Sequence, residues 1–592
     1  MTQAQTGGRT LGFASRLRGV LLASVAVFAA WTVHAQVPGQ PEDTIAVAPK
    51  PLVRAERFMV AAAHPMAVDA GYAALDAGGS AADAAIAVQF MLNLVEPQSS
   101  GIGGGAFLLH WEAETERLTT LDGRETAPAA ATPDYWLGPD GEPIGWREAV
   151  VGGRSVGVPG TLALLLELHA RHGRLPWADL VAPAAAAAEA GFPISPRLAG
   201  SIAGAQDFAL ARFAETRSYF FEPDGSPKAA GTILRNPSFA RTLRRIADQG
   251  NAAFYEGPRA QAIADAVRTE TNPGIMTRDD LAGYRVIERP PVCAPYRGYA
   301  VCGMGPPSSG GLTVGQILGL LAHFEMPRPD AEGLHLLAEA SKRAFADRNL
   351  YMADSDFVRM PLTGLLDPAY LTFRAQGIDR AAATPAPIAA GNPPWREGAL
   401  YAPDTQPERA GTSHISIVDG DGNALSMTTT IETGFGSRVM VGGFLLNNEL
   451  TDFSRAPSRD GRPIANRVEG GKRPRSSMAP TIVFQDGRPI LVLGSPGGSR
   501  IIGYVAQTLV AVLDWGMPLD AALAMGWVVN RNGPQTDVEA GAMRDGLAQA
   551  LVQRGHAATR RDLNSGVHAI AITENGLIGA ADPRREGIAR GR

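Results

Sequence analysis

The clearest β-type pattern of apolar and polar positions lies in the last third of the chain. Two pairs of short apolar segments each flank a turn rich in glycine and aspartate, and such pairs predict β-hairpins. The expected strands are residues 413–418 and 424–431 in the first hairpin and residues 481–485 and 489–493 in the second. Apolar residues then recur at spacings of three, four and three from Ile502 to Val512, which predicts a helix over 499–513.

The earlier part of the chain reads as mainly helical. Helices are expected at residues 65–94, 162–172 and 334–351. A glycine-rich run at 101–105 leads into an apolar strand at 106–111, whereas a nucleotide-binding loop opens a helix, so this run is not a phosphate loop. Residues 381–411 are rich in proline, alanine and glycine and are expected to form an irregular surface segment. Hairpins with helices before and after them indicate an α+β layered fold.

The N-terminus reads as a secretory signal peptide. Three arginines precede an apolar stretch at 20–30, and Val33-His34-Ala35 offers a small-x-small cleavage site. The apolar stretch is shorter than the ~20 residues that span a bilayer, which disfavours a membrane anchor. We therefore expect residues 1–35 to be removed on export, which leaves a periplasmic or secreted protein without a membrane partner.

Composition and charge indicate a globular protein and disfavour one that binds nucleic acid. The chain has 592 residues, 45% hydrophobic and 19% charged, which is ordinary for a globular protein with a large core. Loss of residues 1–35 removes three arginines and no acids, so the formal charge moves from -5 to about -8. Such a surface does not favour nucleic acid, and the basic cluster at 472–475 lacks interleaved aromatic residues.

The chain has two cysteines, Cys293 and Cys302, which bracket a predicted hairpin that turns at Arg297-Gly298. In that register the cysteines lie opposite each other at a non-hydrogen-bonded position, with Cα atoms about 4.5 Å apart. An oxidising compartment favours a disulfide, while two buried thiols remain the alternative.

The dipeptide Gly411-Thr412 at the start of the first hairpin is the main chemical candidate. Cleavage of this bond would make Thr412 a new N-terminus, and its free α-amine, with a pKa of about 8, would serve as the base for its own hydroxyl. Alone, the dipeptide more often marks a loop that enters a strand. Its surroundings decide between these interpretations.

Several motifs together resemble the γ-glutamyltranspeptidase family of the N-terminal nucleophile hydrolase superfamily. The motifs that resemble its small subunit are Gly411-Thr412-Ser413-His414, Leu445-Leu446-Asn447-Asn448-Glu449 with Asp452-Phe453-Ser454, Lys472 to Met478, and Gly494 to Arg500. Those that resemble its large subunit are Asp122-Gly123-Arg124-Glu125-Thr126-Ala127-Pro128, Pro306 to Gly311, and Ala346-Asp347-Arg348. The resemblance covers nearly the whole exported chain.

The resemblance implies a four-layer αββα sandwich, built as one composite domain from both products of a self-cleaving precursor. These products are a large subunit, residues 36–411, and a small subunit, residues 412–592, which remain associated as a heterodimer. It also implies a γ-glutamyl hydrolase and transferase that acts on glutathione and related compounds through a threonyl acyl-enzyme. Water or an amino acid or peptide amine accepts the acyl group.

The resemblance also assigns catalytic roles. Thr412 is the expected nucleophile, and Thr430 on the neighbouring strand is expected to orient it. Gly497 and Gly498 are expected to form the oxyanion hole with their backbone N–H groups. Their position just before the helix at 499–513 supports this, because a helix N-terminus favours developing negative charge.

A γ-glutamyl group presents an α-carboxylate and an α-ammonium, so its site needs donors on one side and acids on the other. Arg124 matches the residue expected to bind the carboxylate bidentately. Ser476 and Ser477 match the hydroxyl donors beside it, and Glu449 and Asp452 match the acids expected on the ammonium.

Two features depart from well-known bacterial relatives. Glu432 stands where they carry an amide, so three acids are expected near the ammonium and one is expected to have a raised pKa. The segment 455–471 appears where they carry a longer lid, and it has no aromatic residue. We expect a more open site that favours hydrolysis over transfer.

Other classes remain as alternatives. A glutaryl or cephalosporin-type acylase of the same superfamily would use the same nucleophile, but a glutaryl group has no ammonium to pair with Glu449 and Asp452. An uncleaved, non-catalytic relative is the second alternative. A zinc enzyme is disfavoured because the chain has no His-Glu-x-x-His motif and no cysteine pair at ligand spacing, and Gly494 to Gly498 does not fit the Gly-x-Ser-x-Gly elbow. No cofactor or metal is expected.

Overall fold

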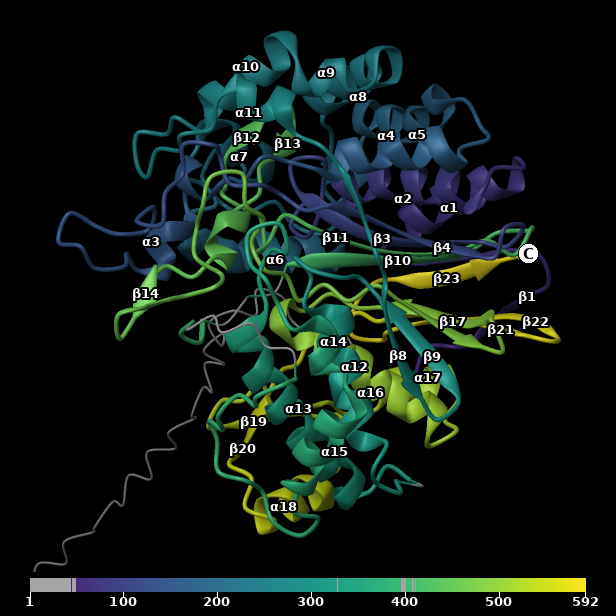
Figure 1. Ribbon diagram of the computed structural model, residues 1–592. Helices are drawn as coiled ribbons and strands as arrows, with labels where there is room; N and C mark the ends of the chain where they lie inside the picture. Colours follow the sequence, from purple (N-terminus) through teal and green to yellow (C-terminus); the bar gives the residue numbers. More distant parts are fainter. Residues whose placement is uncertain (1–43, 45–48, 327, 395–400, 407–408, 410) are drawn as a thin grey trace, which may run out of the picture. The chain divides into compact units, whose positions relative to one another are not determined.

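The computed structural model describes residues 44, 49–326, 328–394, 401–406, 409 and 411–592. The signal peptide predicted at 1–35 lies outside the described residues. Within the described part, two seven-stranded antiparallel sheets stack face to face and helices cover the outer face of each, which confirms the α+β sandwich (Figure 1). No helix of this part combines the length and apolar character needed to cross a bilayer.

The first sheet, called sheet I, carries Thr412 and has the strand order β23-β2-β10-β11-β3-β4-β7. Its strands are β2 (Met59–Ala62), β3 (Gly105–Glu112), β4 (Arg117–Gly123), β7 (Ile287–Arg289), β10 (Thr412–Val418), β11 (Ala424–Thr430) and β23 (Ile588–Gly591). The predicted nucleophile strand β10 therefore lies between β2 and β11, and the C-terminal strand β23 pairs with the far side of β2.

The second sheet, sheet II, has the order β1-β22-β21-β17-β16-β9-β8. Its strands are β1 (Val53–Ala55), β8 (Val292–Tyr296), β9 (Tyr299–Gly303), β16 (Thr481–Gln485), β17 (Arg488–Gly494), β21 (His568–Thr573) and β22 (Gly576–Ala581). Both sheets thus mix strands from before and after residue 411, as expected for one composite domain.

Helices pack on the outer faces of the two sheets. Sheet I is contacted by α1 (Pro65–Asp76), α2 (Ala81–Val95) and α4 (Thr161–His172), while α5 (Trp177–Ala190) packs on α2 and α8 (Pro237–Gln249) packs on α5. Sheet II is contacted by α12 (Gly310–Leu321), α16 (Ile501–Leu513) and α17 (Leu519–Ala524), while α13 (Ala331–Tyr351) packs on α12.

Shorter elements connect these layers. The helices are α3 (Trp146–Val150), α6 (Pro196–Ala205), α7 (Ala214–Phe220), α9 (Ala252–Tyr255), α10 (Gly257–Ala266), α11 (Arg278–Gly283), α14 (Leu362–Leu365), α15 (Pro368–Gln376) and α18 (Asp545–Gln553), and the 3₁₀ turns are η1 (Gly153–Ser155), η2 (Gln206–Phe208), η3 (Glu449–Asp452) and η4 (Gly498–Arg500). The small sheets pair β5 (Phe192–Pro193) with β6 (Ile233–Leu234), β12 (Met440–Val441) with β13 (Phe444–Leu445), β14 (Ser458–Arg459) with β15 (Arg462–Pro463), and β19 (Thr536–Glu539) with β18 (Val528–Val529) and β20 (Ala558–Arg561).

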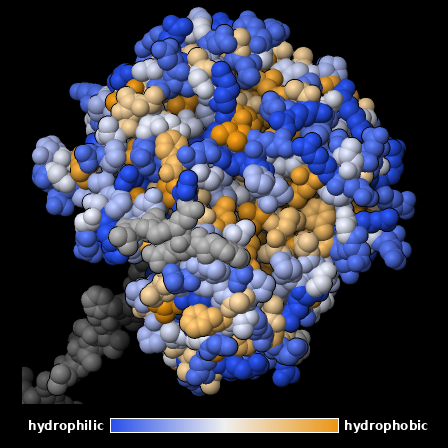
Figure 2. All heavy atoms as spheres, in the orientation of Figure 1, coloured by the Kyte–Doolittle hydropathy of each residue, from blue (hydrophilic) through white to orange (hydrophobic). Residues whose placement is uncertain are grey.

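Sheet I is buried on both faces because its strands alternate between two apolar cores. Along β3, Ala106 and Leu108 pack toward the helices, whereas Phe107 and Leu109 pack toward sheet II. Hydrophilic residues cover most of the face of the molecule seen in Figure 2, so large apolar side chains are concentrated inside. On the inner face of β10, the Ser416 hydroxyl donates to a carbonyl of sheet II at 3.0 Å. Thr412 shares this inner face because the two residues are an even number apart.

The helix expected over 65–94 is two helices, α1 and α2, so that expectation is corrected. Gly78 lies at φ +89°, a left-handed conformation that ends α1. The side chain of Ser80 and that of Asp83 then form a capping box that starts α2. The other expected helices and hairpins are present with ends shifted by a few residues.

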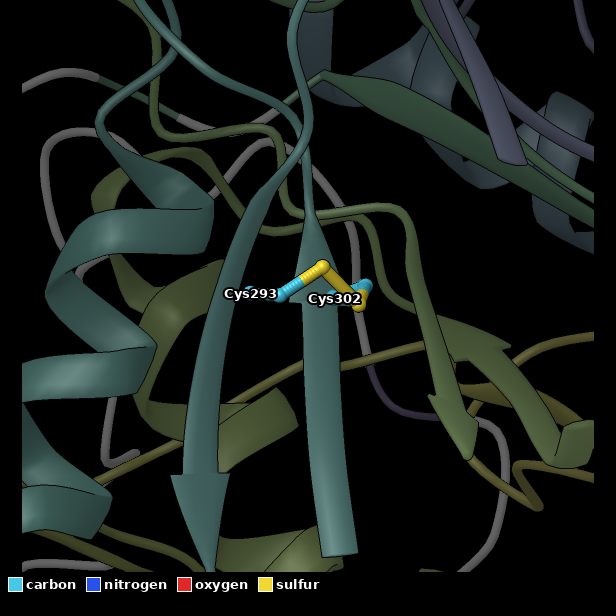
Figure 3. Close-up of a disulfide and its surroundings, with 2 residues drawn as sticks. All are labelled: Cys293 and Cys302. Atoms are coloured by element: carbon cyan, nitrogen blue, oxygen red, sulfur yellow. A yellow bond between two sulfur atoms is a disulfide. The ribbon is translucent and has the colours of Figure 1, made fainter. Parts of the chain in front are cut away.

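The predicted cysteine hairpin is β8 and β9, with Cys293 directly opposite Cys302. The two residues form a disulfide, with Cα atoms 4.0 Å apart (Figure 3). β9 continues into the loop that holds Ser308 and Ser309, so the crosslinked hairpin lies directly before a loop of the site described below.

Candidate active site

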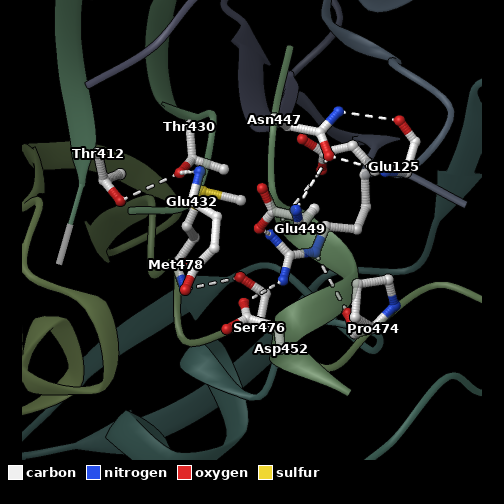
Figure 4. A network of polar contacts seen from close by, with 12 residues as sticks. Glu125, Thr412, Thr430, Glu432, Asn447, Glu449, Asp452, Pro474, Ser476 and Met478 are labelled. Carbon is white, nitrogen blue, oxygen red and sulfur yellow. Dashed lines mark hydrogen bonds and ion pairs between the residues drawn. The ribbon is translucent and has the colours of Figure 1, made fainter. Parts of the chain in front are cut away.

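Thr412 is the first residue of β10 and pairs with Thr430 at the end of β11 (Figure 4). The Thr412 hydroxyl donates to the Thr430 hydroxyl at 3.4 Å, and the Thr430 hydroxyl donates to the carbonyl oxygen of Gly411 at 2.7 Å. The Thr430 oxygen also accepts the N–H of Glu432 at 2.8 Å. A row of hydroxyls therefore leads from the predicted nucleophile to the carbonyl of the predicted cleavage bond.

Close backbone packing holds this end of the site. A Cβ at Gly104 would overlap the carbonyl oxygen of Thr430, and a Cβ at Gly411 would overlap that of Glu432. The glycine-rich run at 101–105 thus allows β3 and β11 to approach closely, which agrees with the exclusion of a phosphate loop. The guanidinium of Arg585 donates to the carbonyl oxygen of Thr412 at 3.2 Å from the other side.

Gly497 and Gly498 lie between β17 and α16, at φ +137° and +57°. These conformations strongly favour glycine, and a Cβ at Gly497 would lie 2.7 Å from the Tyr504 ring. The helix that was expected near 499 begins with the 3₁₀ turn η4 and becomes α-helical at Ile501. Gly498 lines the same small cavity as Thr412, near the positive end of α16.

Arg124 and two acids form a buried ion-pair cluster at the other end of this cavity. The Arg124 guanidinium contacts the carboxylate of Glu449 through Nη1 and that of Asp452 through Nη2, the latter at 2.6 Å. It also donates to the carbonyl oxygens of Pro474 and Arg475, both at 3.2 Å. Burial alone would lower the pKa of Arg124, but the two carboxylates raise it, so the guanidinium stays charged. The residues predicted for opposite ends of a ligand thus neutralise each other in the unbroken chain.

Two serine hydroxyls and a third acid complete the cavity. The Ser476 oxygen accepts the N–H of Met478 at 3.1 Å, and the Ser477 oxygen accepts a guanidinium N–H of Arg348 at 2.6 Å. Carboxylate oxygens of Glu432, Glu449 and Asp452 lie within 4.8 Å of one another. Glu432 has φ +75°, which turns the chain after β11 toward this cluster.

One cavity collects nearly all of the predicted site residues. Its lining comprises Arg124, Thr412, Thr430, Glu432, Glu449, Asp452, Ser476, Ser477 and Gly498, together with Met478 and Ile501. Of the predicted residues, Gly411 and Gly497 lie outside the lining and are each the chain neighbour of a residue within it. These residues come from six separate segments of the chain, around residues 124, 411, 430, 450, 476 and 498.

Three neighbours of the cavity had no predicted role. The Glu125 carboxyl is fully buried beside Arg124 and Glu449, and burial and Glu449 together raise its pKa well above the usual range. Arg348 donates to the hydroxyl of Ser477, and Arg585 donates to the carbonyl oxygen of Thr412. Glu125 and Arg348 both belong to motifs quoted above, but nothing in the sequence indicates which way their side chains point.

Two groups of side chains in the described part of the chain have the spacing of metal ligands. One is Glu432, Glu449 and Asp452, and Arg124 already neutralises two of its members. The other is His335, Glu339 and His556, where Lys342 and Arg343 bind the carboxylate and the two imidazoles are hydrogen-bonded to each other at 2.8 Å. In both groups, cationic side chains of the protein already pair with carboxylates of the group.

His414, close to Thr412 in sequence, is a buried strand residue with both ring nitrogens bonded to hydroxyls. Its Nδ1 lies 2.9 Å from the hydroxyl of Thr428 and its Nε2 lies 3.0 Å from that of Ser416. Burial, with His568 nearby, lowers the pKa of His414 well below its usual range. His414 is therefore a neutral imidazole that fills a polar position between the two sheets.

Comparison with known proteins places the chain within one family. The family model described as gamma-glutamyltranspeptidase matches residues 67–591. The glutathione hydrolase proenzyme of Bacillus subtilis strain 168 is 40% identical over 545 residues, which cover 90% of this chain and 91% of that protein. The acylase ACY 1 proenzyme of Pseudomonas sp. strain V22 is 35% identical over 547 residues, which cover 90% of this chain and 93% of that protein.

A crystal structure of cephalosporin acylase from Bacillus halodurans has the same fold. It superimposes with a TM-score of 0.81 at 29% identity, over 92% of this chain and 97% of that one. The four layers and this likeness define the fold as that of the N-terminal nucleophile hydrolases. The match of the family model over most of the sequence is more specific, and the chain belongs to the γ-glutamyltranspeptidase family.

Proposed function

We propose that the chain is the precursor of a γ-glutamyl hydrolase and transferase, which cuts itself between Gly411 and Thr412 and then cleaves the γ-glutamyl amide of glutathione and related compounds. The observation that carries this proposal is the hydroxyl row from Thr412 through Thr430 to the Gly411 carbonyl. The mature protein is then a heterodimer of residues 36–411 and 412–592, whose interdigitated strands hold the two chains together.

Self-cleavage uses the groups at this end of the cavity. The Thr412 hydroxyl attacks the carbonyl carbon of Gly411, while the Thr430 hydroxyl donates to the carbonyl oxygen as negative charge develops there. The C–N bond breaks as the proton of the Thr412 hydroxyl passes to the Thr412 nitrogen, which frees the α-amine and leaves an ester between Gly411 and the Thr412 oxygen. Water hydrolyses this ester and releases the Gly411 carboxylate.

The free α-amine then makes Thr412 a catalyst. The Thr412 oxygen attacks the γ-carbonyl of the substrate while the amine takes its proton and later passes it to the leaving amine. Backbone N–H groups of Gly497 and Gly498 stabilise the oxyanion. Water or an acceptor amine then takes the acyl group from Thr412. This chemistry needs no metal or cofactor.

When the substrate binds, ion pairs within the protein are replaced by ion pairs between the protein and the substrate. Arg124, Ser476 and Ser477 bind the α-carboxylate, and Glu449, Asp452 and Glu432 bind the α-ammonium. Arg124 pairs with Glu449 and Asp452 in the unbroken chain. A γ-glutamyl group brings both charges, so each buried charge still has a partner when the group enters between them.

The proposal includes export and a preference for hydrolysis. Residues 1–35 act as a signal peptide, which places the enzyme in the periplasm or outside the cell and agrees with a disulfide between Cys293 and Cys302. The segment 455–471 forms only the small hairpin β14–β15 and offers no aromatic residue to cover the site. Transfer to dipeptides that greatly exceeds hydrolysis at neutral pH would contradict this preference.

N-terminal sequencing of purified wild type beside Thr412→Ala tests the proposal. Wild type should yield a new chain that begins Thr-Ser-His, and the variant should remain one chain without γ-glutamyl hydrolase activity. Full activity in an uncut wild-type chain would overturn the mechanism and favour an enzyme with another nucleophile. A single inactive chain after export would favour a non-catalytic relative.

An acylase for glutaryl groups is the second candidate, since a curated relative and a solved structure described above both bear the name of an acylase. Glu449 and Asp452 line the cavity and a glutaryl group has no ammonium to pair with them. We therefore expect a γ-glutamyl anilide to be hydrolysed with a higher kcat/KM than a glutaryl anilide. The reverse order would make glutaryl compounds the substrate class.

A further inference from the structure

Arg348 supports both serines of the cavity from the helix layer beneath them. It lies in the last turn of α13 and is 2% exposed. Its Nη2 donates to the Ser477 hydroxyl at 2.6 Å, and its Nε donates to the Ser309 hydroxyl at 2.8 Å. Ser309 in turn binds the Ser476 carbonyl oxygen through its hydroxyl at 2.7 Å and through its backbone N–H at 2.8 Å. One guanidinium therefore reaches Ser477 directly and Ser476 through Ser309.

These bonds determine which way the Ser477 hydroxyl can donate. A guanidinium has only N–H donors, so the Ser477 oxygen must accept in its bond with Arg348. The hydroxyl proton is thereby directed away from Arg348, on a side chain that lines the cavity. A bond from a cation is short and strong, and it polarises the hydroxyl so that its own O–H becomes a better donor.

We propose that Arg348 is a positioning residue for carboxylate recognition, which holds Ser477 as a hydrogen-bond donor and fixes the backbone of Ser476 through Ser309. This inference rests on the proposed role of the two serines at the α-carboxylate. Arg348 belongs to residues 36–411 and both serines to residues 412–592, so a side chain of one product of self-cleavage orients carboxylate donors carried by the other.

Three p-nitroanilides separate this role from a general loss of structure. The γ-glutamyl anilide carries both charged groups, the glutaryl anilide carries the carboxylate alone, and the 4-aminobutanoyl anilide carries the ammonium alone. Arg348→Gln should raise KM for the first two by about tenfold, as expected for a lost bond to a charged group, and change kcat less than about twofold. Its kcat/KM for the 4-aminobutanoyl anilide should stay at the wild-type value.

Matched variants complete the test. Ser477→Ala should show the same pattern, and the double variant should be no worse than Ser477→Ala, because both changes remove one interaction. Arg343→Gln alters a buried arginine of the same helix that binds Glu339 instead, so it should leave the ratios among the three substrates unchanged. Arg348→Lys keeps the charge but cannot donate to both hydroxyls in the same geometry, so it should show a smaller loss in the same direction.

The possible negative results contradict different parts of the proposal. Equal losses on all three anilides, or additive losses in the double variant, would overturn the positioning role of Arg348. An unchanged carboxylate preference in Ser477→Ala would instead overturn the proposed carboxylate site, whatever Arg348 does. If Arg348→Gln does not cleave itself, the three anilides are compared with Arg348→Lys instead. A wild-type KM of Arg348→Lys for the γ-glutamyl anilide would then count against the proposal.

Discussion

The two ends of the cavity are built on different physical principles. At the nucleophile end, Thr412, Thr430 and Gly498 offer hydroxyls and backbone groups, placed by the register of β10 with β11 and by the turn before α16. At the opposite end, which we call the recognition end, Arg124 pairs with Glu449 and Asp452. Loops, rather than paired strands, place these charged side chains. Geometry is therefore set by the backbone at one end and by a balance of buried charges at the other.

Because of this difference, substitutions at the two ends of the cavity should change different properties of the protein. Backbone register does not change with pH or with a single charge, so substitutions at the nucleophile end should alter rates of bond cleavage more than stability. Buried ion pairs are costly when one partner is lost. Substitutions at the recognition end should therefore alter stability, substrate preference and pH dependence together.

The largest effect is expected for Arg124→Gln. This change leaves the carboxylates of Glu449 and Asp452 buried without their cation, which should cost about 3–5 kcal/mol of unfolding free energy. Denaturant unfolding measures the loss. Arg171→Gln is the control, because Arg171 pairs with acids on the surface and its removal should cost about 1 kcal/mol or less. Equal losses in the two variants would show that the acids do not depend on Arg124.

Thr430→Val tests the nucleophile end. The change removes the hydroxyl that donates to Gly411 and accepts the N–H of Glu432. We expect self-cleavage to slow by about 10²- to 10³-fold. Unfolding free energy should fall by about 1–3 kcal/mol for the buried N–H left without its acceptor, less than in Arg124→Gln. Gel analysis of purified precursor over time follows the cleavage. Thr430→Ser should cleave at nearly the wild-type rate.

Thr429→Val is the matched control for this position. Thr429 is the preceding residue of β11 and points to the other face of the strand, where its hydroxyl finds no partner among the described residues. Normal cleavage in Thr429→Val and slow cleavage in Thr430→Val would assign the effect to one hydroxyl. A large loss of stability in Thr430→Val would break the contrast between the two ends.

The same contrast explains how much of the molecule the sequence predicts. The pairing of Thr412 with Thr430 follows from one hairpin with a short turn, so local pattern is sufficient. The assignment of roles to Arg124, Glu449 and Asp452 came from resemblance to a family. Their contact joins residues 325 and 328 positions apart, which no local pattern reveals.

Two features of the molecule escape the sequence pattern, one for a local reason and one for a long-range reason. The break between α1 and α2 was missed because small apolar residues continue on both sides of Gly78, although the capping box of Ser80 and Asp83 was readable. The environment of Glu125 could not be predicted, because its raised pKa depends on burial and on Glu449, far away in the chain. Tertiary packing, rather than the residue itself, determines the charge of this group.

Glu125→Gln tests the titration of the recognition end. Burial and Glu449 raise the pKa of Glu125 in the folded chain, so above about pH 4.5 the folded state holds a proton that the unfolded state has lost. Unfolding free energy should therefore fall by about 1.4 kcal/mol per pH unit until the folded pKa is reached. Glutamine cannot ionise, so the variant should gain stability relative to wild type as pH rises.

Denaturant unfolding at several pH values between about 5 and 7 measures this difference. Glu114→Gln alters an exposed acid of the β3–β4 turn and should follow the wild-type profile. Parallel profiles for wild type and Glu125→Gln would mean that Glu125 is ionised in the folded chain. The recognition end would then be less sensitive to pH than its buried acids suggest.

Glu432→Gln should have the smallest effect of these variants. It also tests the comparison most directly, because Glu432 contacts residues at both ends of the cavity. Its backbone N–H binds Thr430, while its carboxylate joins Glu449 and Asp452. Glutamine keeps the backbone bond and removes one negative charge, so kcat should stay near wild type while KM for a γ-glutamyl anilide rises up to about tenfold. Preference should also shift toward a glutaryl anilide, which the remaining acids repel less, and Glu432→Asp should keep the wild-type preference. A fall in kcat with unchanged preference would instead mean that Glu432 acts through Thr430, and the two ends would no longer be independent.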